Sequence, residues 1–341
     1  MNCFNENCKK NDIFTKMMLC KGCYKSYYCS RLCQKEHWKN EHRHVCKMHK
    51  KECEKKYQIK LISSNNNGLF ATKTIYRAEK IISEKSILTG QSEADILSKY
   101  MKLNQQNKTI FDNLHNQFPE INRIHGIFKT HAIPLGENSN IGGIFPIISR
   151  CNHSCKANAI SLWDNIDKVE KLFAIKKINP NEEIRVNYNK DYLNNTQQRI
   201  AQLQQQFNFI CNCECCTQND EQSNKNLDYM QSIHSGIVTG MPNKPEQTLL
   251  QIYDLLKLIK FEFPNNDHIY YVSCYDLFQN YIYLQDKKNA HKWLYNAYIC
   301  SKIYLGENDD FVKKNTKYLS IERIHTHPTY RFTQYSQGYK G

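Results

Sequence analysis

The sequence lacks the features of a membrane or secreted protein. Its 341 residues contain no apolar run near the ~18 residues that a bilayer-spanning segment needs. The opening stretch, MNCFNENCKK, has no hydrophobic region of a signal peptide. We therefore expect a soluble, intracellular protein of the cytoplasm or nucleus, monomeric and without a membrane partner.

Arginine is also scarce, although the chain is basic. Lys and Arg together number 47 and the net charge is +14, but only nine of these residues are Arg. Base-specific reading of DNA relies on the Arg fork, so a sequence-specific DNA-binding protein is disfavoured. The first 60 residues hold 15 basic against 6 acidic residues, a charge of +9. A solvated Lys-rich surface is the plain explanation, an acidic protein is another partner, and weak non-specific nucleic-acid binding remains a third hypothesis.

Cysteine, in contrast, is abundant and clustered. Eight of the 16 cysteines lie within residues 1–53, and six more lie in 151–155 and 211–216. Because the cytosol keeps thiols reduced, these clusters indicate metal ligands rather than disulfides.

The first cluster has the spacing of a zinc module. Seven Cys and one His follow the pattern C3-x4-C8-x11-C20-x2-C23-x5-C29-x3-C33-x8-H42-x3-C46, which makes two tetrahedral sets. Too little apolar sequence lies between them for a core, so zinc must supply the folding free energy. The i,i+4 spacing of Cys29/Cys33 and of His42/Cys46 predicts ligand pairs on helical faces.

This stretch, LCKGCYKSYYCSRLCQKEHWKNEHRHVC, resembles the MYND zinc finger. The resemblance implies a structural, protein-binding module over residues 1–50 with interleaved sites. One site would be formed by Cys3, Cys8, Cys29 and Cys33, and the other by Cys20, Cys23, His42 and Cys46. His44 is an alternative ligand with poorer spacing to Cys46.

Three later segments resemble the SET domain of protein lysine methyltransferases. They are NNNGLFATKTI (65–75), GGIFPIISRCNHSCKAN (142–158) and NEEIRVNY (181–188). A cysteine-rich stretch that resembles a post-SET tail, FNFICNCECC, follows them. Helix-period apolar residues over about 91–129 predict a helical insert, in a SET domain of residues 57–195 with a post-SET segment of 196–217. An N-terminal MYND finger joined to a SET domain is typical of fungal and protist-like members of the SET–MYND group.

The resemblance implies an enzyme that transfers a methyl group from S-adenosylmethionine to lysine on a histone or another protein. Tyr188 would be catalytic, and Phe207 would line the lysine channel. The expected cofactor contacts are Asn67, Gly68, His131, Asn152, His153, Tyr188 and Phe209. A third zinc would be held by Cys155, Cys211, Cys213 and Cys216, because three thiolates so close in sequence need a remote fourth. Cys151 and Cys215 would be surplus, although Cys215 could compete with Cys216.

Some residues depart from the family pattern. Asn66 replaces the first glycine of the turn, His131 stands where an Asn usually contacts the cofactor, and Asn181 replaces a turn glycine. These departures support an alternative function, a catalytically inactive adaptor that binds proteins through its finger and its helical region.

The remaining chain predicts a helical domain. Residues 218–247 are polar with Gly and Pro and are expected to be a linker, with a single helix within it as the alternative. Residues 248–320 have the pattern of successive helices, and 321–341 are expected to be a tail. The helical part resembles the tetratricopeptide-like C-terminal domain of the SET–MYND group. The expected fold is thus α+β and multidomain: a zinc finger, a β-rich SET domain with its insert and post-SET segment, and an α-helical domain.

Overall fold

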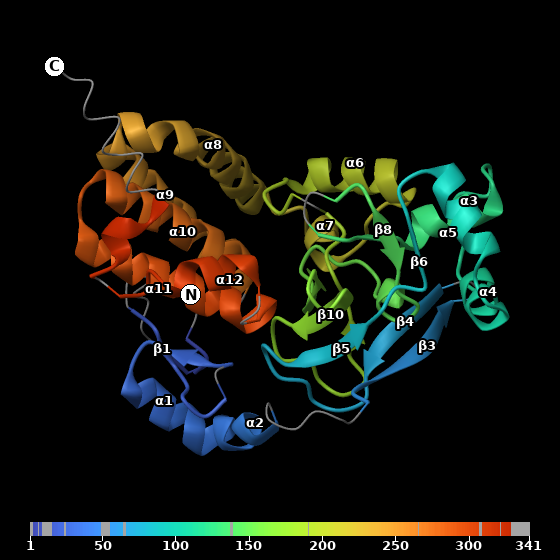
Figure 1. The fold of residues 1–341 in the computed structure, drawn as a ribbon, viewed down its shortest axis with the longest axis horizontal. Coiled ribbons are helices and arrows are strands. Elements are labelled where there is room, and N and C mark those ends of the chain that lie inside the picture. Colours follow the sequence, from blue (N-terminus) through green and yellow to red (C-terminus); the bar gives the residue numbers. More distant parts are fainter. Residues whose placement is uncertain are drawn as a thin grey trace. The chain divides into compact units, whose positions relative to one another are not determined.

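The chain forms two compact units, shown in Figure 1. The computed structural model describes residues 3–5, 7–8, 16–23, 25–48, 55–63, 66–136, 139–189, 191–264, 266–306, 309–320 and 322–328. One unit is Cys53–Asp220, and the other combines Met1–Glu52 with Glu221–Gly341. Among the described residues, every helix is too short or too polar to cross a lipid bilayer.

The first unit is built on three small antiparallel sheets, with strand orders β5-β10-β9, β11-β4-β3 and β6-β8-β7. The strands are β3 Tyr57–Ser63, β4 Asn66–Ala71, β5 Lys80–Glu84, β6 Leu88–Gly90, β7 Ile133–Pro134, β8 Gly142–Ile144, β9 Ala159–Asp164, β10 Val169–Ala174 and β11 Glu183–Ile184. Buried residues of the first two sheets share one apolar core that includes Leu69, Ile75, Phe145, Leu172 and Ile184. The β-rich character expected of this part of the chain is therefore confirmed.

A loop passes beside β11 and brings two distant motifs together. The short 3-10 helix η2, Ile148–Arg150, leads into residues 151–155. His153 forms a parallel bridge with Val186, because Ser154 N donates to Val186 O at 3.0 Å and Val186 N donates to Asn152 O at 3.0 Å. These backbone bonds hold the Asn-His loop against the segment that ends at Tyr188.

The same unit also contains helices. The insert contains α3 Glu93–Met101, α4 Gln105–Asp112 and α5 Arg123–His131, which pack around Phe111 and Ile127 in a second core. The post-SET segment contains α6 Thr196–Phe207 and α7 Glu214–Gln218. A capping box between Asn195 and Gln198 fixes the start of α6.

The second unit begins with the small finger. Its elements are β1 Met18–Leu19, β2 Tyr27–Tyr28, α1 Arg31–His37, the π-helical turn η1 Trp38–His42 and α2 Arg43–Met48. Ser30 caps α1 by accepting a hydrogen bond from Cys33 N. Cys29 therefore precedes the helix, so the expected helical-face pair of Cys29 and Cys33 is wrong, whereas His42 and Cys46 do lie on one helical run.

The other elements described in this unit are helices. They are α8 Glu221–Asn243, α9 Pro245–Glu262, α10 Asp267–Tyr283, α11 Lys287–Leu305, α12 Asp310–Thr316 and the 3-10 turn η3 Ile324–Thr326. The expected linker over 218–247 is mostly the long helix α8. Its buried residues recur at helical spacing, and they are Leu227, Met230, Ile233, Ile237 and Met241. This period outweighs the Gly and Pro that suggested a linker.

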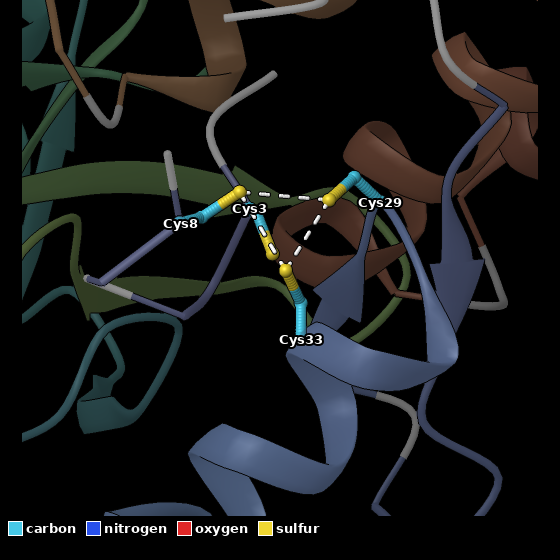
Figure 2. A group of neighbouring side chains, drawn as sticks. All are labelled: Cys3, Cys8, Cys29 and Cys33. Carbon is cyan, nitrogen blue, oxygen red and sulfur yellow. Dashed lines mark hydrogen bonds between the residues drawn. The ribbon is translucent and has the colours of Figure 1, made fainter. Parts of the chain in front are cut away.

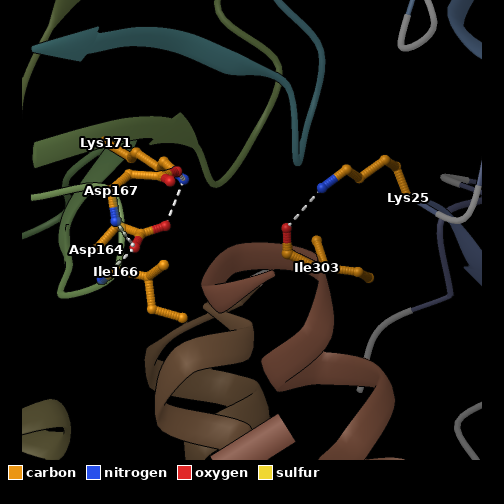
Figure 3. A network of polar contacts seen from close by, with 6 residues as sticks. All are labelled: Lys25, Asp164, Ile166, Asp167, Lys171 and Ile303. Carbon is orange, nitrogen blue, oxygen red and sulfur yellow. Dashed lines mark hydrogen bonds and ion pairs between the residues drawn. The ribbon is translucent and has the colours of Figure 1, made fainter. Parts of the chain in front are cut away.

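The finger packs on α11 within this unit. Met17 N donates to the Asn296 side chain at 3.4 Å, and Lys25 Nζ donates to Ile303 O at 3.1 Å (Figure 3). Lys16 lies over the ring of Tyr295 at 4.6 Å. The two ends of the chain are thus parts of one folded body.

The expected tail also differs from the structure over its first residues. Ile324 is fully buried and His327 is 5% exposed. The apolar side chain and the ring are removed from water by packing on the helices, so residues 322–328 belong to the folded unit. Residues 329–341 lie outside the described residues.

Candidate zinc and cofactor sites

Four cysteines from separate parts of the finger meet at its first site. Cys8 Sγ lies 3.5 Å from Cys29 Sγ and 3.6 Å from Cys33 Sγ, and Cys29 and Cys33 are 3.5 Å apart (Figure 2). Cys3 completes the group. Four thiolates bound tetrahedrally at about 2.3 Å from zinc have sulfurs about 3.8 Å apart, so this set fits the ion.

The second finger site contains three cysteines and a histidine. Cys20, Cys23, His42 and Cys46 form one group, with His42 Nε2 at 3.2 Å from Cys20 Sγ and 3.7 Å from Cys23 Sγ. Hydrogen bonds from Cys23, and then from His42, lower the pKa of the Cys20 thiol, which favours the thiolate that binds metal.

The surroundings of this second site explain two details of the sequence. A Cβ at Gly22 would lie 2.9 Å from Cys46 Sγ, so the turn between Cys20 and Cys23 needs a glycine. His44, the alternative ligand, is exposed and absent from the group.

The third cysteine group joins the Asn-His loop to the post-SET segment. Cys155 lies with Cys213, Cys215 and Cys216 in one group, and with His153 and Cys211 in another. Its sulfur is 3.5 Å from that of Cys216. The loop thiol and the four thiols of the tail are all brought together, with one more sulfur than a tetrahedral zinc needs.

A buried arginine accompanies this third group. Arg199 on α6 is 7% exposed, and its Nη2 donates to Cys215 Sγ at 3.5 Å and to Thr196 Oγ1 at 3.0 Å. A zinc ion with four thiolates carries two negative charges, and a buried charge needs a partner. Arg199 was not anticipated from the sequence, because nothing in the helix pattern shows which residue faces the cysteines.

Asn152 is held in one orientation by the neighbouring motifs. Its Nδ2 donates to Glu183 Oε1 at 2.8 Å and to Asn67 O at 3.3 Å. Arg185 Nε in turn donates to the same carboxylate at 2.6 Å. With both amide hydrogens engaged, the amide oxygen of Asn152 is the atom left to accept a hydrogen bond from a ligand.

The glycine turn lies beside this carboxylate. A Cβ at Gly68 would lie 2.8 Å from Glu183 Oε1 and 2.6 Å from Ile62 Cδ1, so a side chain there would displace Glu183. Asn66 is the first residue of β4, and Asn181 has a φ of 64°, which Asn tolerates.

Three rings surround that of Tyr188, the last residue of the NEEIRVNY motif. Tyr188 has ring-centroid distances of 5.3 Å to His153, 5.1 Å to Phe207 and 6.4 Å to Phe209. Its hydroxyl donates to Cys151 O at 2.5 Å. Burial raises the pKa of Tyr188 and keeps the phenol neutral, and burial lowers the pKa of His153 to about 4. The arrangement is a site of half-buried aromatic rings with one phenolic oxygen.

His131 is engaged elsewhere. Its Nδ1 lies 3.2 Å from Ser149 O and its Nε2 lies 2.9 Å from His115 O. Burial lowers its pKa to about 4, so the ring is neutral and donates only one of these two bonds. The ring thus joins the insert to η2, and its expected contact with the cofactor stays a prediction.

Comparison with known proteins agrees with this arrangement. Residues 66–189 match the family model described as the SET domain, and residues 3–46 match the one described as the MYND finger. The chain therefore combines a MYND finger with a SET domain. In this SET–MYND protein the finger precedes the SET domain, as the order of the motifs predicted.

Its relatives carry methyltransferase names. "N-lysine methyltransferase SMYD2-B" of Danio rerio is 29% identical over 220 residues, 58% of this chain and 47% of the relative. "Histone-lysine N-methyltransferase SMYD1" of Homo sapiens is 25% identical over 229 residues, 59% of this chain and 45% of the relative. The SET–MYND chain therefore spans about half the length of the curated relatives it matches.

Among solved structures, a SET domain titled as LSMT bound to lysine and AdoHcy is similar at 11% identity. The similarity covers 90% of this chain and 97% of that chain, with a TM-score of 0.31.

Two positioning residues of this SET–MYND protein were missed in the sequence. Glu183 lies inside the NEEIRVNY motif but was not given a role, and it accepts a hydrogen bond from Asn152. Gln117 lies in the insert, and its Nε2 donates to Asn208 O at 3.1 Å. The motif could have drawn attention to Glu183. Gln117 leaves no signal, because its partner is a backbone oxygen 91 residues away.

Proposed function

We propose that the protein is a protein lysine N-methyltransferase that uses S-adenosylmethionine and holds three structural zinc ions. One observation carries this proposal: Asn152, His153, Tyr188, Phe207 and Phe209, from three separate segments, meet in one site. When bound, the cofactor supplies an electrophilic methyl group on a positively charged sulfur. The substrate is a lysine of a histone or another protein.

The residues of the chain would prepare a lysine for this transfer. A lysine amine is protonated in water, with a pKa near ~10.4. Burial among Phe207, Phe209 and Tyr188 disfavours the charged amine and so lowers its pKa. Because the Tyr188 hydroxyl donates its hydrogen to Cys151 O, its oxygen remains free to accept an N–H from the amine and to orient it.

The cofactor would be held by the loop and the post-SET aromatics. The amide oxygen of Asn152 would accept a hydrogen bond from a donor such as an amino group, and Phe209 would stack on a planar ring. At Asn67 and Gly68 the backbone would approach the cofactor closely. His131 is the remaining residue proposed to contact the cofactor.

The zinc ligands proposed for the three sites are those expected from the sequence. At the third site Cys215 is the alternative ligand, because it lies in one group with Cys155, Cys213 and Cys216, whereas Cys211 lies in a group with Cys155 and His153.

A protein partner at the finger and the helical region is the second part of the proposal. A catalytically inactive adaptor is the alternative function, and the observation in its favour is that both nitrogens of His131 already face backbone carbonyls. Calorimetry separates the two, since the enzyme binds S-adenosylmethionine when its zinc sites are full and the adaptor does not.

The decisive test is methyl transfer from labelled S-adenosylmethionine to a lysine peptide array. The substitution Tyr188→Phe removes the hydroxyl that orients the amine. We expect it to lower kcat/KM by about 10²-fold or more. Tyr100→Phe is the matched control, because it removes a hydroxyl that bonds Asp112 in the insert. Equal activity of the Tyr188→Phe and wild-type proteins would show that Tyr188 is not catalytic.

A further inference from the structure

The tautomer of His153 is fixed by the backbone of Tyr188. Tyr188 N lies 3.0 Å from His153 Nδ1 and hydrogen bonds to it. A backbone N–H can only donate, so Nδ1 must present its lone pair and carry no hydrogen. The ring is then neutral, and its single hydrogen is on Nε2.

That hydrogen is directed at a sulfur of the third cysteine group. His153 Nε2 lies 3.2 Å from Cys155 Sγ. The same sulfur is approached by Nδ2 of the buried Asn189 at 3.9 Å. Cys155 therefore receives N–H groups from two sides, as suits a thiolate that carries negative charge.

We propose that His153 is a positioning residue that connects the third zinc site with Tyr188, by accepting from Tyr188 N and donating to the metal-bound sulfur of Cys155. This inference rests on the third zinc site of the proposed function. It gives the histidine a task distinct from contact with the cofactor. Partners that orient a metal ligand in this way contribute to the affinity for the metal.

The alternative, His153 as a zinc ligand through Nε2, conflicts with the same geometry. A ligand nitrogen must offer its lone pair to the metal, which would place the hydrogen on Nδ1. Two N–H groups would then face each other across the 3.0 Å between Tyr188 N and Nδ1. The proximity of His153 to Cys155 and Cys211 is therefore that of a hydrogen-bond donor.

Two amide variants separate the two bonds of the ring. In His153→Asn the side chain ends at the δ position, where its oxygen replaces Nδ1 as acceptor for Tyr188 N but nothing reaches Cys155. In His153→Gln it ends at the ε position, where its nitrogen replaces Nε2 as donor to Cys155. We expect the Asn variant to lose about tenfold or more in affinity at the third zinc site, and the Gln variant to stay within about threefold of wild type.

Native mass spectrometry of the zinc-loaded 341-residue chain, titrated with a chelator, counts the ions retained. Cys155→Ser identifies the third ion among them. The inference is supported if wild type retains the third zinc ion best, His153→Gln nearly as well and His153→Asn least. Equal retention in both variants, or a weaker Gln variant, would overturn it while leaving the zinc site and the enzyme proposal intact.

Cobalt substitution gives an independent reading of the ligands. The expected absorption and magnetic spectra are those of four sulfur ligands at the third site, unchanged in His153→Gln. A spectrum of three sulfurs and one nitrogen that is lost in His153→Gln would make His153 a ligand and overturn the inference. A wild-type protein that binds only two metal ions would remove the third site itself, and with it both this inference and that part of the proposed function.

Discussion

At the scale of single residues, the backbone of Asn208 determines where two aromatic rings lie. Asn208 follows α6 in the left-handed conformation, with φ of 56° and ψ of 38°. This turn ends the helix after Phe207 and lets Phe209 approach Tyr188 as well. Gln117 holds the turn by donating to Asn208 O. Asn and Gly adopt this conformation most readily, whereas a Cβ without a local polar group disfavours it.

Substitutions at Asn208 test this conformation. Asn208→Ala should destabilise the unit by about 1–2 kcal/mol, because Ala is strained at positive φ. Asn208→Gly is the matched control and should remain within about 0.5 kcal/mol of wild type. The measurement is the urea dependence of hydrogen exchange in peptides from α6, which reports this unit alone. An Ala variant as stable as the Gly variant would contradict the argument.

At the scale of elements, η3 attaches the C-terminal residues to the helices through His327. Its ring makes edge contacts with Phe278 at 4.7 Å and Tyr318 at 4.6 Å, and its Nε2 lies 3.4 Å from Tyr275 OH. Burial, followed by the charge of Lys317, lowers the pKa of His327 to about 4. The folded protein therefore favours the neutral ring.

This shift predicts how stability depends on pH. The unfolded histidine has a pKa near ~6.5, so between pH 6.5 and 4 the unfolded state binds more protons than the folded state. The contribution of His327 is thus complete above pH 6.5 and is lost as the pH falls towards 4. The stability of His327→Gln should change less over this window than that of wild type. His125→Gln, at a half-exposed site in the other unit, serves as the control.

Two measurements check this prediction. Nuclear magnetic resonance of labelled histidines should place the pKa of His327 well below 6.5, with the signal assigned by its absence in His327→Gln. Peptide-resolved hydrogen exchange, corrected for the effect of pH on the intrinsic exchange rate, should be faster in residues 322–328 at pH 5 than at pH 7. A normal pKa, or identical pH profiles of wild type and variant, would contradict it.

The elements also show what could be predicted from the sequence. The finger residues expected to bind zinc lie together in the two expected groups, because metal ligands leave fixed spacings between Cys and His. The Asn-His loop and Tyr188 were placed in one site by motif. Helix α8 was mistaken for a linker because Gly236, Gly240 and Pro242 obscured its buried stripe.

Bonds to the backbone were the part that the sequence could not supply. The ring of His131 lies between two carbonyls, those of Ser149 and His115, which the sequence did not predict. A carbonyl is present at every residue, so no residue type marks such a partner. The same reason hides the bond between Gln117 and Asn208.

At the scale of the whole molecule, the two chain ends form one unit. The finger contacts α11 through Met17, Lys25 and Lys16, although more than 270 residues separate the partners. Because zinc stabilises the finger, we infer that zinc also protects from hydrogen exchange the face of α11 on which the finger packs. The SET unit has its own proposed zinc site and its own cores. Its polar contacts include Lys171 with Asp164 and Asp167 (Figure 3).

Removing one zinc site at a time should therefore open different parts of the molecule. Cys20→Ser removes a ligand of the finger, and loss of its bonds to α11 should raise hydrogen exchange in residues 295–305 by about tenfold, the equivalent of one or two hydrogen bonds. Cys155→Ser is the matched change in the SET unit, and it should raise exchange in α6 and α7 while leaving α11 as in wild type. Exchange mass spectrometry on both variants, with zinc content measured in parallel, gives the answer. If Cys20→Ser loses its zinc and unfolds the finger but leaves α11 protected, the finger and the helices are independent, and the joining of the chain ends does not stabilise the helical region.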